Sequence, residues 1–265
     1  MTGPTATLPA ADAVRRLHDL GGRVALVTGG GSGLGQAMAF GLACFGADII
    51  IVDRDGSAAA AAARDIAARS GRRSAGVVAD VSVEGEVMRA VEEAIAAFGR
   101  VDVLVNNAGH NIRKPLVQFD CEEFDSLHAV HVRGAFLFCR ALGPHMRERR
   151  SGSIINIASI LGQVGAVNVS AYAAAKAAVA QLGRGFALEM APYGVRVNSI
   201  APGYIDTALT RQHAPEVRER ICNTTPLGRF GEPAELIGPV VFLASDASSF
   251  VTGSTLIVDG GWTAQ

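Results

Sequence analysis

Runs of consecutive apolar residues recur along the chain, and the clearest of them is Ile49-Ile50-Ile51-Val52. A strand with one face in water alternates apolar and polar residues, whereas a strand covered on both faces is apolar throughout. Such runs are typical of a parallel sheet that carries helices above and below it. This pattern restricts the chain to α/β architectures.

Seven short β-branched segments alternate with longer helical segments, and no Pro/Ser-rich linker or break in composition divides the 265 residues. We therefore expect one Rossmann-type doubly wound domain over residues 21–265, with a seven-stranded parallel sheet flanked by helices. The predicted strands are Val24–Thr28, Asp48–Val52, Ser74–Val78, Val103–Asn106, Ser153–Ala158, Arg196–Ile200 and Thr255–Val258. The predicted helices are Gly35–Phe45, Ser57–Ser70, Val83–Phe98, Cys121–Arg149, Ala171–Ala191 and Pro233–Leu243.

Two segments fall outside this alternation. Residues 1–20 are expected to form a partly flexible N-terminal extension, beginning with a loose tail of about ten residues. The irregular stretch from about Gly203 to Glu232 is too long for an ordinary connection, and loops of that length are often lids. We expect a substrate lid around residues 204–230.

Composition and charge exclude several classes of protein. Hydrophobic residues make up 49% of the chain, which excludes a disordered protein. The net charge of −1, without a basic stripe, argues against nucleic acid and membranes as partners. The sequence contains no apolar stretch long enough to span a membrane and no signal core, and its four cysteines lack CxxC spacing. We expect a soluble cytoplasmic protein without a metal site.

A glycine-rich turn, Gly29-Gly30-Gly31-Ser32-Gly33-Leu34-Gly35, links the first predicted strand to the first helix. Free N–H groups at a helix N-terminus bind a diphosphate, and glycine lets the ligand approach the backbone. The second strand leads to Asp53, at the spacing where a carboxylate meets the adenosine ribose. This carboxylate would repel a 2′-phosphate, whereas Arg54 could pair with one. We expect a dinucleotide site in which NAD is favoured and NADP is the alternative.

Tyr172 and Lys176 lie four positions apart on a predicted helix and therefore share a face. A neighbouring ammonium favours the phenolate and would bring the pKa of the phenol toward the working range. Ser159 follows a predicted strand at its carboxyl end, where open α/β sheets bind ligands, and its hydroxyl could bond a substrate oxygen. With the glycine turn, these residues predict a proton-handling site beside a dinucleotide.

Together these motifs resemble the short-chain dehydrogenase/reductase superfamily from about Leu20 to Trp262. The resemblance implies hydride transfer between nicotinamide and a secondary alcohol or ketone. It implies Tyr172 as acid/base, Lys176 as its electrostatic partner and ribose anchor, and Ser159 as the carbonyl polariser. The matching motifs are Thr28-Gly29-(x)3-Gly33-Leu34-Gly35, Asn106-Asn107-Ala108-Gly109, Ser159, Tyr172-(x)3-Lys176, Pro202-Gly203 and Val258-Asp259-Gly260-Gly261.

The resemblance also implies contacts along the cofactor. Asp80 and Val81 are expected beside the adenine, and Ile205 and Thr207 near the carboxamide. Asn107 is expected either to contact the cofactor or to brace the sheet. The full set of expected cofactor residues is Gly29, Ser32, Gly33, Leu34, Gly35, Asp53, Arg54, Asp80, Val81, Asn107, Ala108, Gly109, Tyr172, Lys176, Pro202, Gly203, Ile205 and Thr207.

One residue departs from the family pattern. The family usually has an asparagine that holds a water linking the lysine to bulk solvent, and alignment places His131 there. Imidazole can hold a water or relay a proton itself, and it titrates near neutrality. Alternatively, the ring fills space and bonds a carbonyl. We favour the relay, which would make His131 a fourth catalytic residue.

The loop His110-Asn111-Ile112-Arg113-Lys114-Pro115 would leave the sheet beside this site. Its two cations and hydrogen-bonding groups would suit a polar, carboxylated substrate, although they could equally be ordinary surface charges. This loop, Phe119 and the turn at 202–207 resemble gluconate 5-dehydrogenases and related sugar-acid or polyol dehydrogenases. The expected substrate-binding residues are Ser159, Tyr172, His110, Arg113 and Tyr204.

The sequence leaves two other functions open. A 3-oxoacyl-carrier-protein reductase would need a basic patch, which Arg133 and Arg147–Arg150 could form, but it usually prefers NADPH, against which Asp53 argues. A non-catalytic dinucleotide-binding sensor or scaffold would be expected to have lost one of the three catalytic residues, and all are present.

Relatives in the family generally assemble as tetramers through two long helices and the C-terminal strand. These helices carry more apolar surface than one buried face requires, which supports a homotetramer. The residues behind this expectation are Ala173, Ala174, Ala177, Ala178, Phe136, Leu137 and Phe138.

Overall fold

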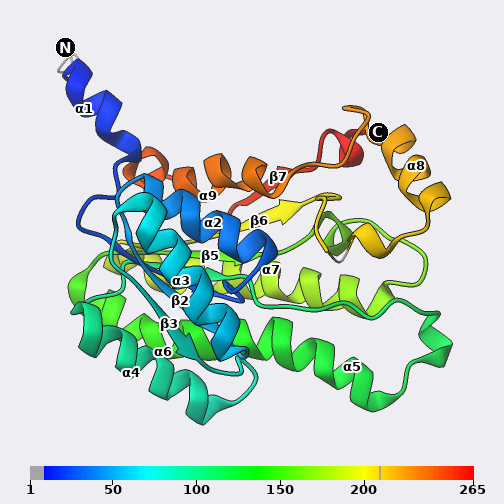
Figure 1. The fold of residues 1–265 in the computed structure, drawn as a ribbon, viewed down its shortest axis with the longest axis horizontal. Helices are drawn as coiled ribbons and strands as arrows, with labels where there is room; N and C mark the ends of the chain where they lie inside the picture. Colours follow the sequence, from blue (N-terminus) through cyan, green and yellow to red (C-terminus); the bar gives the residue numbers. More distant parts are fainter. Residues whose placement is uncertain (1–8, 209) are drawn as a thin grey trace, which may run out of the picture.

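The computed structural model describes residues 9–208 and 210–265, and its centre is the predicted seven-stranded parallel sheet. Helices cover both faces of this sheet (Figure 1). The strand order is β3-β2-β1-β4-β5-β6-β7, with every pairing parallel. The strands are β1 Val24–Thr28, β2 Asp48–Asp53, β3 Ser74–Val78, β4 Val103–Asn106, β5 Gly152–Ile157, β6 Val195–Pro202 and β7 Thr255–Val258.

The order of the strands reverses beside β1. From β1 the chain moves outward to β2 and β3, then crosses back to β4 and continues to β7. The connections that leave the carboxyl ends of β1 and β4 therefore diverge and open a crevice, where ligands bind in open α/β sheets. The glycine turn after β1 and the Asn107-Ala108-Gly109 segment after β4 both lie at this crevice.

The helices form two layers. In one layer, α2, α3 and α9 cover one face, and in the other, α4, α6 and α7 cover the opposite face. Helix α5 continues into α6 through a short π-helical turn. The helices are α1 Ala11–Arg15, α2 Gly33–Cys44, α3 Gly56–Ser70, α4 Glu84–Phe98, α5 Cys121–His128, α6 Gly134–Arg149, α7 Ser170–Met190, α8 Pro215–Thr224 and α9 Ile237–Ala244.

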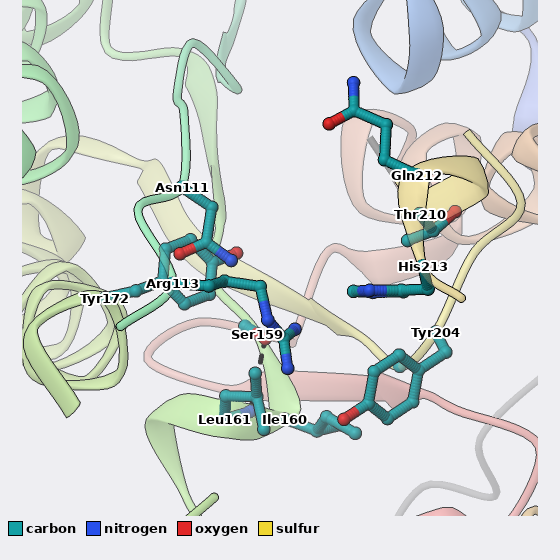
Figure 2. Close-up of a pocket in the computed structure, with 11 residues that line it drawn as sticks. Asn111, Arg113, Ser159, Ile160, Leu161, Tyr172, Tyr204, Thr210, Gln212 and His213 are labelled. Carbon is teal, nitrogen blue, oxygen red and sulfur yellow. Dashed lines mark hydrogen bonds between the residues drawn. The ribbon is translucent and has the colours of Figure 1, made fainter. Parts of the chain in front are cut away.

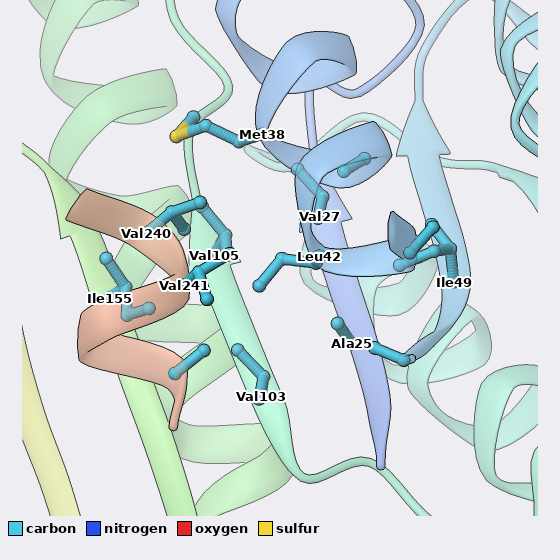
Figure 3. Close-up of a cluster of buried hydrophobic side chains, with 14 of the residues drawn as sticks. Ala25, Val27, Met38, Leu42, Ile49, Val103, Val105, Ile155, Val240 and Val241 are labelled. Carbon is cyan, nitrogen blue, oxygen red and sulfur yellow. The ribbon is translucent and has the colours of Figure 1, made fainter. Parts of the chain in front are cut away.

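Strand register explains the fully apolar runs. Val27, Val105 and Ile155 pair across β1, β4 and β5 and belong to the core under α2 and α9 (Figure 3). Their preceding neighbours, such as Leu26 and Leu104, point to the other face and join the core under α4 and α6. Burying such a side chain contributes about 1.5–3 kcal/mol. Both faces therefore require apolar residues at successive positions.

Four helical predictions need correction. The predicted helix Cys121–Arg149 is interrupted by a π-helical turn at Ala129–Arg133, and the predicted helix Pro233–Leu243 begins with a 3-10 turn at Pro233–Leu236. The stretch 203–232 is not irregular throughout, because it contains α8. Leu137 and Phe138, expected on an apolar surface, are buried in the core under α4 and α6, although Phe136 is 44% exposed.

The N-terminal segment lies partly within the described residues. Residues 1–8 of the predicted loose tail lie outside them. The short helix α1 that follows contains no buried residue, whereas Leu20 is completely buried against the domain. In the described part of the chain, no helix is long and apolar enough to cross a membrane, and no group of three or more His, Cys, Asp or Glu could hold a metal.

Candidate active site

A cavity of ≈ 560 Å³ follows the carboxyl ends of the central strands. It is lined by every residue predicted to contact the cofactor except Gly35, and also by Ser159, His110 and His131. The lining residues that the sequence did not predict are Ala79, Val130, Ile157, Ala158, Ala208 and Thr210. Ala79 directly follows β3 and Ala158 directly follows β5, so the rule that ligands lie at strand ends would have found both.

Gly35 has a packing role that the sequence did not predict. A Cβ on Gly35 would lie 2.2 Å from the carbonyl oxygen of Gly29 and 2.5 Å from Asn107 Nδ2. The missing side chain therefore lets α2 begin directly against the glycine turn, so that the N-terminus of α2 faces the cavity. Gly35 does not itself line the cavity, and its contact with a cofactor stays a prediction.

Asn107 braces the crevice as well as lining it. Its Nδ2 donates to the carbonyl oxygens of Thr28 at 2.9 Å and Gly29 at 3.0 Å. The Thr28 hydroxyl oxygen accepts from the backbone N–H groups of Asn107 and Ala108. These bonds fix the turn after β1 to the segment after β4, which supports the bracing role.

Asp53 ends β2 at the far end of the same cavity. Its Oδ2 accepts from Gly31 N at 3.0 Å, and its Oδ1 accepts from Asp55 N at 3.1 Å. The carboxylate is thereby held beside the glycine turn. Arg54 lines the cavity next to it.

Ser159, Tyr172 and Lys176 converge where β5 ends beside α7. Ser159 and Tyr172 together line both this cavity and a neighbouring one, and Ser159 Oγ accepts from Leu161 N at 3.1 Å. Lys176 is buried, and its Nζ donates to the carbonyl oxygen of Ile157 at 2.6 Å. The predicted trio is therefore assembled at one place.

Burial dominates the acid–base properties of this trio. It raises the pKa of Tyr172 to about 12, against which the hydrogen bond from Ser159 acts. It also lowers the pKa of Lys176 to about 7. Lys176 Nζ lies 5.7 Å from the centre of the Tyr172 ring. The pKa of the phenol is therefore raised, and not lowered as predicted, because desolvation is the largest effect on it.

His131 is held in the π-helical turn between α5 and α6. Its Nε2 lies 2.7 Å from the carbonyl oxygen of His110, and its ring meets the Tyr172 ring edge-on at 5.4 Å. Gly109 permits this approach, since a Cβ there would lie 2.2 Å from His131 Cε1. Burial and the nearby Lys176 ammonium lower the pKa of His131 to about 2. Titration near neutrality, as predicted, is therefore wrong, and the ring bonds a carbonyl.

A second cavity of ≈ 340 Å³ adjoins the first and shares Ser159, Tyr172, Gly203 and Thr210 with it. Figure 2 shows Asn111 and Arg113 entering it from the loop after β4, opposite the lid. Arg113 and Tyr204 line it as predicted, whereas His110 lines the larger cavity instead. The lining residues that sequence reasoning did not assign are Asn111, Ile160, Leu161, Thr210, Gln212 and His213.

Only one of the two cations in the loop after β4 is available to a ligand. Lys114 forms an ion pair with Glu123 and lies over the Phe119 ring at 5.1 Å. Arg113 makes no ion pair or side-chain hydrogen bond with the described residues. The second cavity therefore has a free guanidinium on one wall and the Ser159–Tyr172 pair on another.

Asp206 ties together the segment that is predicted to be a lid. Its carboxylate accepts from Arg211 Nε at 3.1 Å and from Arg218 Nη2 at 3.0 Å, and these two arginines lower its pKa. Arg218 also lies over the Phe230 ring at 4.3 Å. These contacts hold the segment that carries Thr210, Gln212 and His213 over the second cavity (Figure 2).

A family model described as "Enoyl-(Acyl carrier protein) reductase" matches residues 29–263, and curated relatives match with about 40% identity. The chain belongs to the short-chain dehydrogenase/reductase family. As a short-chain dehydrogenase/reductase, it is an oxidoreductase that acts on CH–OH groups and binds a nicotinamide dinucleotide.

Among its similar short-chain dehydrogenases/reductases is the 5-keto-D-gluconate 5-reductase of Escherichia coli (strain K12), 39% identical over 92% of this chain and 97% of the relative. The cis-4-hydroxycyclohexanecarboxylate dehydrogenase of Sinomonas cyclohexanicum is 43% identical over 91% and 97%. A crystal structure of gluconate 5-dehydrogenase from Burkholderia cenocepacia J2315, in complex with NADP and tartrate, superposes with a TM-score of 0.92, 40% identity and coverage of 95% and 99%.

Proposed function

We propose that this protein transfers a hydride between a nicotinamide dinucleotide and a secondary alcohol of a carboxylated, sugar-acid substrate. The free Arg113 guanidinium, in the cavity that also contains Ser159 and Tyr172, is the observation that carries the proposal. Guanidinium binds carboxylate in a bidentate manner, and Asn111, Tyr204, Gln212 and His213 offer hydrogen bonds to hydroxyl groups.

The substrates in the names of the three similar proteins suggest a narrower substrate class for this protein. In gluconate oxidised at C5, the reacting carbon is four bonds from the carboxyl carbon, and the same holds for 5-keto-D-gluconate and for cis-4-hydroxycyclohexanecarboxylate. We propose that this protein measures the same separation, with Arg113 at the carboxylate and Tyr172 at the hydroxyl. Its substrates would then be δ-hydroxy or δ-keto carboxylates.

Each member of the catalytic trio receives a role in this proposal. Ser159 donates its hydroxyl hydrogen to the substrate oxygen, and Tyr172 takes the hydroxyl proton during oxidation or returns it during reduction. Lys176 holds the ribose of the cofactor. The nicotinamide supplies or accepts the hydride, while the protein orients the reactants and handles the proton.

NAD and NADP differ in the 2′-phosphate, so we propose that the side chains at the end of β2 decide between them. We propose that NAD is favoured because the Asp53 carboxylate would repel a 2′-phosphate, and that NADP is also accepted because Arg54 lies beside it. The similar gluconate 5-dehydrogenase structure contains NADP. Replacing Asp53 by Ala should improve kcat/KM for NADP relative to NAD, and replacing Arg54 by Ala should do the reverse.

The substrate proposal is tested with gluconate, 5-hydroxyhexanoate, 4-hydroxypentanoate and the neutral polyol glucitol. The δ-hydroxy acids should be oxidised with the highest kcat/KM. Arg113→Ala should raise KM for gluconate about 10- to 100-fold, as expected for a lost hydrogen bond to a charged group, without changing KM for glucitol. Lys114→Ala, whose partner is Glu123, is the matched control. Equal effects of Arg113→Ala on gluconate and glucitol would disprove carboxylate recognition.

The acyl-carrier alternative is less well supported. Of the arginines that could receive an acidic carrier, Arg147–Arg150 lie at the end of α6, before β5 begins, and hence at the amino edge of the sheet. There, Arg149 pairs with Asp102 at 3.0 Å, Arg147 stacks on Tyr193, and Arg150 donates to Pro192. The arginines of this cluster already contact other residues of the protein, and the cluster lies at the edge of the sheet opposite the active site. A 3-oxoacyl thioester in the same assay serves as the test of this alternative.

A further inference from the structure

The second cavity, of ≈ 340 Å³, carries a positive charge that no carboxylate of its wall balances. Among the described residues, its lining includes the Arg113 guanidinium and no Asp or Glu side chain. Arg113 comes from the loop after β4, and the segment 203–213 forms the opposite wall (Figure 2). A cation without a neighbouring carboxylate makes this cavity attractive to an anion.

His213 lies on the wall opposite Arg113. Figure 2 shows its imidazole ring extending into the cavity, across from the Arg113 guanidinium. The side chain is half-buried, and its ring forms no hydrogen bond or ion pair with residues 9–208 or 210–265. The backbone N–H of His213 donates to the carbonyl oxygen of Thr210 at 3.3 Å. Both ring nitrogens are therefore open to a ligand.

Arg218, rather than the imidazole itself, holds the turn that carries His213. Arg218 Nη1 donates to the carbonyl oxygen of Thr210 at 3.1 Å, and Nη2 donates to Asp206 Oδ1 at 3.0 Å. Asp206 also accepts from Arg211, so the carboxylate of the lid is committed to these two arginines. The imidazole is thus held in place while its own nitrogens remain available for a ligand.

The charge of the His213 ring depends on its neighbours. Burial lowers the pKa of His213, and the Arg113 and Arg218 guanidinium groups lower it further. The neutral ring is therefore the main form near pH 7 until an anion enters. A carboxylate placed between His213 and Arg113 would favour the imidazolium, because an opposite charge within about 4–6 Å stabilises the charged form. Tyr172 and Tyr204 are the other titratable groups on the cavity wall.

We propose that the carboxylate of the substrate binds between Arg113 and His213, and that the imidazole takes up one proton from solvent as the carboxylate binds. The imidazolium then donates a charge-assisted hydrogen bond, while the guanidinium contributes two of its N–H groups. The proposal rests on the proposed function, because it gives the same carboxylate a second ligand.

This arrangement makes His213 a specificity-determining residue. A neutral polyol brings no charge that would support the imidazolium, so it binds the neutral form of the ring. The proton returns to solvent when the carboxylated product leaves, and it therefore does not enter the balance of hydride transfer.

The proton uptake is tested in complexes that cannot react. With NADH bound, gluconate has no hydride acceptor, and hexanoate is 5-hydroxyhexanoate without its hydroxyl group. Titration calorimetry in buffers of different ionisation enthalpy should find about half a proton taken up per carboxylate at pH 7. In NMR spectra of the protein with labelled histidine, either ligand should raise the pKa of His213 by about one unit or more. The neutral polyol glucitol should cause neither change.

Variants separate the contributions of the two side chains. His213→Gln can still donate to a carboxylate but cannot take up a proton, so the uptake should disappear. The wild type should bind gluconate about five- to ten-fold more weakly at pH 8 than at pH 6, and the variant should not show this difference. Lys176, whose pKa lies near 7, is present in both proteins, so the comparison reports on His213. Arg113→Ala should weaken gluconate binding and raise the pKa of His213 without ligand, because a repelling charge is removed.

His128→Gln removes a histidine outside this cavity and is the matched control. Carboxylate binding without proton uptake, or with the same uptake in His213→Gln, would overturn the proposal and leave His213 as a neutral partner of hydroxyl groups. If His213→Gln does not fold, calorimetry of the wild type still decides whether a proton is taken up.

The same measurements distinguish this inference from the proposed function. If the wild type oxidises gluconate but takes up no proton, the reaction stands and the role of His213 fails. If it oxidises none of the hydroxy acids but binds hexanoate with proton uptake, the carboxylate site stands and the proposed reaction fails. If neither carboxylate binds, the inference is refuted.

Discussion

At the scale of single residues, the surroundings of the Tyr172 phenol shift its pKa away from the ordinary value. Burial holds its pKa near 12, so the hydroxyl stays protonated until another group receives the proton. Tyr172→Phe removes this group while keeping the ring that packs against His131. We expect kcat to fall by about 10²- to 10⁴-fold with little change in thermal unfolding. Near-normal turnover in steady-state assays would contradict the acid/base role.

His131 makes a second prediction at this scale, for stability. Its pKa in the folded protein, about 2, lies below its ordinary value of 6.5, so between these values the unfolded chain binds a proton that the folded protein excludes. The stabilisation is present above about pH 6.5 and is lost as the pH falls.

In denaturant titrations, the wild type should lose about 1.4 kcal/mol more per pH unit below about pH 6.5 than His131→Gln does. His128→Gln should follow the wild type. Parallel pH dependence of the wild type and His131→Gln would show that the ring is not excluded from protonation.

At the scale of elements, the lid depends on Asp206 and its two arginines. Arg218→Met keeps the stem over Phe230 but removes the charge that holds Asp206. We expect KM for the sugar acid to rise about five-fold, or about 1 kcal/mol, with kcat/KM measured at low and high salt converging in the variant. Arg220, on the same helix outside this network, provides the matched control as Arg220→Met. A KM unchanged in Arg218→Met would mean that the lid is held by other contacts.

The sequence predicted elements well where one local rule dominated. Four strands, such as Val24–Thr28, match to the residue; every residue of this strand is buried between the two helical layers. The π-helical turn at Ala129–Arg133 was not predicted; it carries His131, whose ring bonds the backbone of His110, 21 positions away, a contact that no local pattern reveals. The roles of Gly35 and of His110 were missed for the same reason: both depend on which segments meet in space.

The convergence of Ser159, Tyr172 and Lys176 at one place was predictable because each of them carries its own sequence signal. The acid–base behaviour was not, because the pKa values of Tyr172 and Lys176 follow from burial, which no spacing rule measures. The residues that line the substrate cavity were predicted only in part. Arg113 was predicted from its place after β4, whereas Gln212 and His213 reach the cavity only through the path of the lid.

At the scale of the whole molecule, apolar side chains remain exposed on the surface. Leu188 on α7 is 79% exposed, Phe136 on α6 is 44% exposed, and Phe250 before β7 is fully exposed. We propose that these surfaces meet in a homotetramer, as expected from the family resemblance. Sedimentation at micromolar concentration should find four chains per particle, and Leu188→Asp should shift it toward smaller species. A monomeric wild type would refute this assembly.

The reversal of strand order beside β1 gathers segments from the whole chain at one crevice. The larger cavity draws on the connections after β1 to β6, whereas the other cavity draws on the loop at 111–113, residues 159–161 and the segment 203–213. Because Gly203 and Thr210 line both cavities, a graft of the segment 203–213 would alter the dinucleotide site as well, whereas the loop at 111–113 lines the smaller cavity alone of the two. Exchange of that loop is therefore the narrower route to a new substrate preference among related dehydrogenases.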